Sequence, residues 1–223
     1  MKSSQFFLVI CLALLGFISC RIQKQQRSTG KMGEGSTPAS TQQASSEQRV
    51  IELKPAVQNG KYGYIDGTGR FVIKPQFEEA GPFSEGLAWV RIGKRYGYID
   101  TNGNVVIKPL FEKEHPSDDP PTGSFSEGLA AVQVKADLYG YIDKSGQFVI
   151  KPQFQDAQPF SEGLAAVQIG GVDQYRYGYI DKTGKFVIKP QFEEAGPFSR
   201  GRAQVKIGGK TIFIDKTGKD ISS

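Results

Sequence analysis

Acidic side chains recur at fixed places along this chain, and they are the first residues to consider for chemistry. Five aspartates each stand three residues before a glycine. Such carboxylates, if gathered into a ring, could bind a cation, but an aspartate in Asp-x-x-Gly more often accepts hydrogen bonds from backbone N–H groups of the turn. We therefore interpret these aspartates as turn caps. They are Asp66, Asp100, Asp143, Asp181 and Asp215.

Lysine and glutamate recur in a similar way. Four lysines precede a proline and could form an anion-binding ring, although a solvated role is the favoured interpretation. Three glutamates lie in Phe-Ser-Glu-Gly motifs, and Arg200 takes the same place in a fourth, which argues against a catalytic set. The lysines are Lys74, Lys108, Lys151 and Lys189, and the glutamates are Glu85, Glu127 and Glu162.

Composition argues against several classes of function. The chain has one histidine, and both of its cysteines lie within the first 20 residues, so we expect no Ser-His-Asp or Cys-His catalytic set and no cysteine metal cluster. The net charge of +5 falls to +2 in residues 48–223, which gives little support for nucleic-acid binding. We expect no enzyme activity, metal or cofactor, and a hydrolase using the repeated carboxylates is the minor alternative.

Two irregular features are the candidates for partner contact. Residues 112–124 are polar and proline-rich and include His115, Asp118 and Asp119. One histidine with scattered carboxylates is a weak metal site, so we interpret the segment as a surface loop, with partner contact as the alternative. The sole tryptophan, Trp89, either packs on a neighbouring element or is exposed for protein or sugar recognition.

The N-terminal residues predict an export signal and a tether. Phe6 to Phe17 is an apolar run of about 12 residues, too short to span a membrane as a helix. The run ends in Leu15-Gly16-Phe17-Ile18-Ser19-Cys20, which resembles a bacterial lipobox. That resemblance implies cleavage of residues 1–19 and diacylation of Cys20. An ordinary cleaved signal peptide and an uncleaved anchor are the alternatives, and the polar residues 20–48 are predicted to be a disordered tether.

The remainder of the chain, residues 49–223, is one unit repeated. Tyr-Gly-Tyr-Ile-Asp occurs four times, and a divergent copy follows at 211–215, with successive spacings of 34, 43, 38 and 34 residues. Phe-Val-Ile-Lys-Pro-Gln-Phe and Phe-Ser-Glu-Gly-Leu-Ala follow in the same order within the units. This pattern resembles the WG repeat of bacterial proteins, with tyrosine at the tryptophan position. The resemblance implies a β-repeat and no common activity. The units are about 61–93, 95–134, 138–169 and 176–207, with a partial unit at 210–221.

The motifs predict three short antiparallel strands in each unit. The glycine inside Tyr-Gly-Tyr predicts a bulge or a close backbone approach, Asp-x-x-Gly predicts a hairpin, and the proline should end the second strand. Residues 50–57 look like a lone third strand, while 211–221 supply only a first and a second. We therefore predict an all-β fold in which 50–57 complete the last unit and close a five-bladed, propeller-like ring. An open, twisted array of the units is the alternative.

Together these features predict a lipid-anchored protein of the bacterial cell envelope, with its domain in the periplasm or on the cell surface. Its repeat domain is expected to be a non-catalytic binding or scaffold module for other envelope proteins. A carbohydrate- or peptidoglycan-binding module using Trp89 and the repeated tyrosines is the alternative.

Overall fold

The computed structural model describes residues 52–112, 122–134, 138–171 and 174–222, all within the unit Gln48–Ser223. Strands and turns make up these ranges, and they hold no helix that is long and apolar enough to cross a membrane. The predicted signal peptide, Cys20 and the tether lie outside the described residues, as do His115, Asp118 and Asp119.

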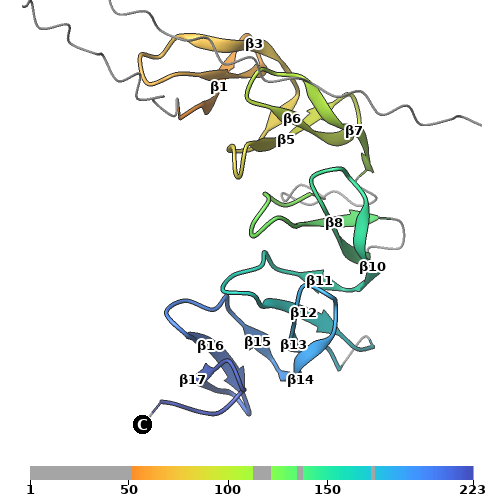
Figure 1. The fold of residues 1–223 in the computed structure, drawn as a ribbon, viewed down its shortest axis with the longest axis vertical. Coiled ribbons are helices and arrows are strands. Elements are labelled where there is room, and N and C mark those ends of the chain that lie inside the picture. Colours follow the sequence, from red (N-terminus) through yellow and green to blue (C-terminus); the bar gives the residue numbers. More distant parts are fainter. Residues whose placement is uncertain (1–51, 113–121, 135–137, 172–173, 223) are drawn as a thin grey trace, which may run out of the picture. The chain divides into compact units, whose positions relative to one another are not determined.

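The strands form five antiparallel sheets in a row, so the predicted all-β repeat architecture is confirmed (Figure 1). The first sheet contains β1 (Lys54–Gln58), β2 (Lys61–Ile65) and β3 (Phe71–Phe77), and the second contains β4 (Glu79–Ala80), β5 (Leu87–Ile92), β6 (Arg95–Asp100) and β7 (Val105–Glu112). The third contains β8 (Ala130–Val134), β9 (Leu138–Ile142) and β10 (Phe148–Phe154). The fourth contains β11 (Asp156–Ala157), β12 (Ala165–Ile169), β13 (Arg176–Ile180) and β14 (Phe186–Phe192), and the fifth contains β15 (Glu194–Ala195), β16 (Arg202–Ile207) and β17 (Lys210–Asp215).

Each sheet takes strands from two successive repeats. The third strand of one repeat pairs with the first strand of the next, as β5 pairs with β6 through Trp89 and Tyr98. Residues 54–58 are the lone third strand that the sequence predicts, but β1 pairs with β2 and not with the last repeat. The predicted ring closure by residues 50–57 is therefore wrong. A tight turn at Asn59 and Gly60, both with positive φ, joins β1 to β2, so this pairing needs only a short loop.

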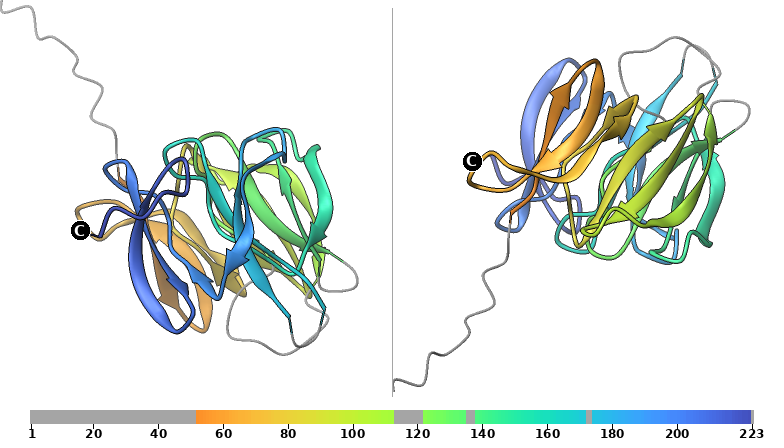
Figure 2. Two further views of the ribbon diagram at one scale, coloured as in Figure 1. Left: turned by 90° about the horizontal axis from the view of Figure 1, so that it is seen from below. Right: turned by 90° about the horizontal axis from the view of Figure 1, so that it is seen from above.

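The buried apolar side chains support an open row. They gather into four clusters, one between each pair of successive sheets. A closed ring of five sheets would need a fifth cluster, and none of the four joins described residues of the first and fifth sheets. Figure 2 looks along the row, where the first sheet (orange) and the fifth (blue) overlap in projection, and Figure 1 shows them at its opposite ends.

A tyrosine from each of the first four sheets joins it to the next sheet. The Tyr64 hydroxyl donates a 2.8 Å hydrogen bond to the Gly81 carbonyl, and its ring lies 4.6 Å from that of Phe83. The same hydrogen bond recurs at 2.7 Å from Tyr98 to Gly123, Tyr141 to Gln158 and Tyr179 to Gly196. Burial raises the pKa of all four tyrosines, so they remain neutral donors. Each ring contributes buried apolar area while its hydroxyl satisfies a carbonyl.

The repeated glycine sits opposite a bulge in the outer strand, as predicted. Pairing jumps from Tyr96–Phe111 to Tyr98–Ile107, so extra residues of β7 face Gly97. A Cβ atom at Gly97 would lie 2.5 Å from the Ile107 carbonyl oxygen. The prediction that proline ends this strand is wrong: Pro109 lies in the bulge of an edge strand, where its missing N–H group breaks no ladder bond.

The repeated aspartates cap hairpin turns, as the sequence predicts. Asp143 accepts bonds from the N–H groups of Ser145 at 2.8 Å and Gln147 at 3.1 Å, and Gly146 follows with a φ of 83°. The pKa of Asp143 is lowered mainly because the Ser145 hydroxyl donates a hydrogen bond to its carboxylate. Asp66, Asp100, Asp181 and Asp215 have the same backbone bonds and lowered pKa values.

The Ser-Glu-Gly turns form clasps between successive sheets. The Glu85 carboxylate accepts the Gly128 N–H at 3.0 Å and pairs with Lys144 at 3.2 Å, while the Lys144 ammonium also donates to the Glu85 carbonyl. The Ser84 hydroxyl donates to the Phe125 carbonyl. Glu127 repeats the clasp with Gly163 and Lys182, and Glu162 does so with Gly201 and Lys216. Desolvation raises the pKa of Glu85 and Glu127, but the lysine and N–H bonds outweigh it, so each pKa is lowered.

We predict that Gly97→Ala destabilises the domain by about 1–3 kcal/mol or more, because its Cβ atom would meet the Ile107 carbonyl. Gly67→Ala is the matched control, since nothing lies within 4 Å of its Cβ position and its φ is not positive. Urea unfolding of both variants measures the difference. Equal midpoints for the two variants would contradict the assigned bulge.

Stability should also fall in acid. The capping aspartates have folded pKa values below their unfolded values, so their contribution is complete above about pH 4 and is lost as the pH falls through the folded pKa. We expect the thermal midpoint to stay level from pH 7 to about pH 5 and to drop steeply below about pH 4. Asp143→Asn, which keeps an acceptor oxygen, should lower the midpoint at neutral pH and flatten this dependence. A midpoint that is constant down to about pH 3 would contradict the analysis.

Candidate functional site

The repeated charged residues do not converge on one site. The five aspartates and three glutamates are engaged in turn caps and clasps, each in its own turn. Lys74, Lys108, Lys151 and Lys189 are exposed on the outer strands of four different sheets. Within the described ranges, no group of three or more His, Cys, Asp or Glu side chains could hold a metal ion.

Trp89 lies between the second and third sheets. Its side chain is half-buried and packs against the cluster that joins those sheets, with its ring 6.0 Å from Tyr96. The indole covers Gly81, where a Cβ atom would lie 2.2 Å from its ring nitrogen. Because the indole sits over a glycine and beside a tyrosine, the surface that it offers to a ligand is small.

A small cavity of 300 Å³ lies beside Arg91, Glu79 and Tyr96. Arg91 pairs with Glu79 at 2.9 Å, and the Tyr96 hydroxyl donates to the same carboxylate at 2.6 Å. Desolvation and this carboxylate raise the pKa of Tyr96. The Glu79 carboxylate is thus engaged by both of its neighbours, while the buried Arg91 Nε has no hydrogen-bond partner among the described residues.

The larger cavity is a groove of 780 Å³ on the fifth sheet. It lies on the face that would meet a sixth sheet if the row continued. Arg202, Gln204 and Lys206 of β16 and Thr211 and Phe213 of β17 line it. The Ser-Arg-Gly turn and the Ala195–Pro197 backbone form another wall, and Gln158 and Tyr177 reach it from the fourth sheet.

The groove presents polar residues where interior sheets present apolar ones. Pairing across β16 and β17 aligns Gln204 with Phe213, as it aligns Ala166 with Tyr179 in the fourth sheet and Trp89 with Tyr98 in the second. Arg202 bridges to Ser199, as the buried leucines do in interior turns. Those leucines are Leu87, Leu129 and Leu164.

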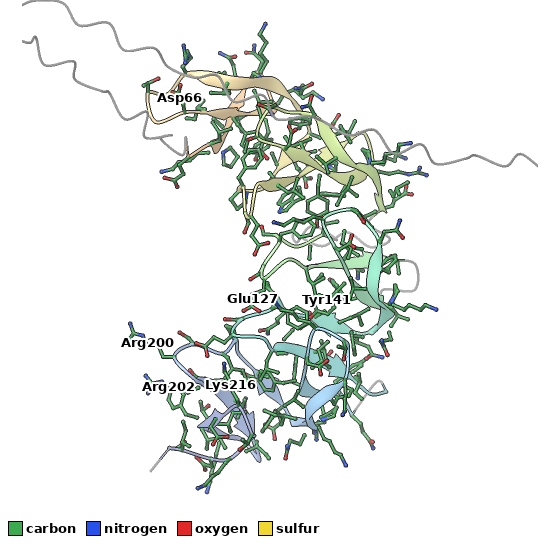
Figure 3. All side chains as sticks on the ribbon, viewed as in Figure 1. Asp66, Glu127, Tyr141, Arg200, Arg202 and Lys216 are labelled. Atoms are coloured by element: carbon green, nitrogen blue, oxygen red, sulfur yellow. The ribbon has the colours of Figure 1, made fainter. Side chains whose placement is uncertain are left out.

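The groove carries an excess of positive charge. Glu194 pairs with Lys206 at 2.8 Å, and among the described residues Arg200 and Arg202 have no carboxylate partner within 4 Å. Arg202 lies over the Phe213 ring, with its guanidinium carbon 5.1 Å from the ring centre. Figure 3 shows both arginines extending from the fifth sheet.

Arg200 keeps the backbone conformation of the interior glutamates. Its φ is 53°, and the φ of Glu85, Glu127 and Glu162 is 50–52°. Left-handed backbone is uncommon for non-glycine residues, and in the interior turns the clasp accompanies it. The same turn therefore places a guanidinium at the end of the row, where earlier turns place a carboxylate.

The sequence identifies Arg200 as an exception to the repeat but does not assign it to a site. The signal was present, because the departures at Arg200, Arg202, Gln204 and Phe213 all fall within 14 residues of the last repeat. What the sequence did not show is that these four positions share one face. That follows from the pairing of β16 with β17.

Similarity to solved structures is low. The computationally designed Ika8 protein is 12% identical with a TM-score of 0.48, over 76% of this chain and 57% of that one, so the chain spans little more than half of Ika8. A protein of unknown function from Bacteroides caccae is 15% identical with a TM-score of 0.36, over 77% of each chain. BamB from Moraxella catarrhalis is 11% identical with a TM-score of 0.39, over 79% of this chain and 73% of that one. These scores are too low to assign an activity, and a search of curated proteins gave no match.

The repeat itself is recognised by a family model described as the WG containing repeat. It matches residues 62–96, 96–136, 139–172 and 177–210, which is more than half of the chain. Each range begins at the first tyrosine of a Tyr-Gly-Tyr motif, so the four ranges correspond to the four full repeats. The chain belongs to the WG-repeat family.

Proposed function

We propose that this protein is a membrane-anchored bacterial lipoprotein whose WG-repeat domain is a non-catalytic module for binding other proteins. The observation that carries the proposal is the open groove on the fifth sheet, which is polar, cationic and uncovered by the described residues. Interior sheets use the same face to bind a neighbouring stretch of polypeptide.

The distribution of polar groups favours binding over catalysis. The repeated carboxylates bond to turn N–H groups or lysines in separate turns, and the buried tyrosines bond to carbonyls. Catalytic sites require unlike groups that converge on one reacting atom. In the described residues, the repeated carboxylates and the buried tyrosines are already engaged in holding turns and sheets together.

The second part of the proposal is a lipid anchor at Cys20. The lipobox-like residues 15–20 would leave Cys20 as a diacylated N-terminus, and residues 21–48 would hold the domain at a distance from the membrane. Such an anchor would place the domain in the periplasm or on the cell surface.

We predict that Cys20→Ser abolishes incorporation of labelled palmitate and moves the protein from the membrane fraction to the soluble fraction. Cys11→Ser is the matched control, because it changes the other cysteine of the same apolar segment and should leave anchoring intact. If the Cys20→Ser protein remains membrane-bound and labelled, the lipoprotein assignment is wrong.

Binding is tested by capture from native envelope extract on immobilised residues 48–223, which contain the four core clusters of the described residues. We expect at least one protein to be retained saturably and to be competed by free domain. A variant lacking residues 113–120 restores the spacing of the other repeats and tests the loop of His115, Asp118 and Asp119. Loss of the partner on trimming would assign binding to this loop.

Absence of any saturable protein partner would contradict a protein-binding role. Retention of peptidoglycan or glycan that falls on Trp89→Ala, in a variant with an unchanged thermal midpoint, would support the carbohydrate-binding alternative.

A further inference from the structure

We propose that the groove on the fifth sheet is a docking site for an acidic, extended segment of a partner protein. This inference rests on the proposed binding function and names its surface and the chemistry of its ligand.

Interior interfaces show what this face of a sheet binds. In the first interface, the segment from Glu79 to Ser84 crosses the first sheet, where Tyr64 bonds the Gly81 carbonyl and contacts the Phe83 ring. In the fourth, Tyr179 bonds the Gly196 carbonyl at 2.7 Å, and its ring lies 4.8 Å from that of Phe198. The repeated face is thus a surface for an extended stretch of polypeptide with an accessible carbonyl and an aromatic side chain.

The serine of each interior turn adds a second contact to backbone. Ser84, Ser126 and Ser161 each donate to the carbonyl of the phenylalanine in the next turn, at 2.6–2.7 Å. Ser199 occupies the same place at the edge of the groove, where it lines the cavity and is exposed. It retains the hydroxyl donor that the other repeats use on a polypeptide carbonyl.

The groove differs from the interior faces in its charge. Glu85, Glu127 and Glu162 accept an N–H group and a lysine of the following sheet. Arg200 stands in their place and can only donate, so a ligand that contacts it must offer an acceptor. Arg202 adds a second guanidinium where leucine is buried elsewhere. Two guanidinium groups without an ion-pair partner among the described residues select a ligand that carries carboxylates.

Two occupants from this chain itself fit poorly. The tether carries Arg21, Lys24, Arg27 and Lys31 against only Glu34 and Glu47, so its charge has the same sign as that of the groove. A second copy stacked end to end would bring its β1 against the fifth sheet. Lys54 of β1 pairs with Ile65 as Ala203 of β16 pairs with Ile214, so the two residues occupy equivalent positions. Ala203 shares a core cluster with Leu164 of the fourth sheet, so this position faces the preceding sheet.

That register makes end-to-end stacking unfavourable. Lys54 of a second copy would face Arg202, the residue that takes the place of Leu164. The ion pair of Lys54 with Glu52 is long, at 3.9 Å, and both side chains are exposed, so stacking would still bring two cations together. Like-charge juxtaposition suppresses a wrong partner. The structure therefore favours a different polypeptide, one whose acidic groups complement both arginines.

The probe is a peptide of residues 78–86, Glu-Glu-Ala-Gly-Pro-Phe-Ser-Glu-Gly, with blocked termini. It contains the segment that covers the first sheet, and its three glutamates supply the required charge. We would titrate residues 48–223 against the fluorescently labelled peptide, up to about 1 mM, and follow anisotropy. We expect saturable binding of one peptide per domain that weakens with added salt.

Charge variants locate the site. Arg200→Glu should weaken binding at least ~10-fold, and the milder Arg200→Gln should weaken it by a smaller factor. Lys189→Glu is the matched control, because it makes the same charge change on the outer strand β14 and should leave affinity within about 2-fold. A peptide with glutamine in place of its three glutamates should bind at least ~10-fold more weakly. Both arginine variants alter exposed side chains, and their thermal midpoints should match that of the parent domain.

Several results would overturn the inference. These are no binding at about 1 mM, equal weakening by Lys189→Glu, or Arg200-dependent binding of a polyuronate in the absence of peptide binding. Self-association of the domain that competes with the peptide would assign the groove to a second copy. If the captured envelope partner is retained equally by the parent domain and Arg200→Glu, the binding function stands and this groove is not its site.

Discussion

The hydrogen bond from a buried tyrosine to a carbonyl of the next sheet is the interaction on which this architecture depends. A phenol buried between two sheets must find an acceptor, because an unsatisfied hydroxyl would cost more than the bond gains. Tyr64, Tyr98, Tyr141 and Tyr179 find theirs in the segment that leads into the next sheet. A sheet that carries this tyrosine therefore needs a successor, and the row is built from that requirement.

The fifth sheet lacks both the tyrosine and a sheet after it among the described residues. Phe213 stands at the tyrosine position, and the described part of the chain forms no further sheet that could offer it a carbonyl. Ile212 replaces the glycine of Tyr-Gly-Tyr, and among the described residues β17 has no bulged outer strand beside it that would exclude a side chain there. The segment after β17 pairs with it instead, because the Ile221 N–H donates to the Phe213 carbonyl. The divergence of residues 211–215 from the repeat thus reflects the loss of particular neighbours.

The glutamate–lysine clasps show a similar correspondence at the first and second sheets, where both partners are missing. Lysine follows the capping aspartate in the third, fourth and fifth sheets, each of which receives a glutamate from the preceding Ser-Glu-Gly turn. The second sheet has Thr101 at that position, and residues 50–52 before the first sheet read Val-Ile-Glu in place of Ser-Glu-Gly. Glutamate and lysine are absent together, as expected of groups that stabilise the protein only as a pair. Partly exposed pairs of this kind are each worth little, and their regular hydrogen-bonded geometry gives them value as a set.

Local chemistry was predictable from the sequence, and the assembly of the sheets was not. Strand positions, the aspartate caps and the bulge at glycine follow from residue type and near neighbours, and the structure contains all three. The prediction of a closed ring was wrong because strand order depends on which strands meet in space. The sequence motifs divide the chain into repeats, whereas each sheet combines strands of two successive repeats. The prediction that proline ends its strand was wrong because proline is tolerated in an edge strand, and whether a strand lies at an edge is a property of the completed sheet.

The groove was hidden for the same reason. Arg202, Gln204 and Phe213 are each ordinary departures from a motif until β16 and β17 place them on one face. Polar termini are required of any repeat array, since an apolar end would recruit further copies. Solubility alone would be met by any mixture of polar groups, whereas this end retains Ser199 and the left-handed turn and adds two guanidinium groups without a carboxylate partner among the described residues. An end that keeps the frame for binding polypeptide but reverses its charge is better explained by selection of a partner than by capping alone.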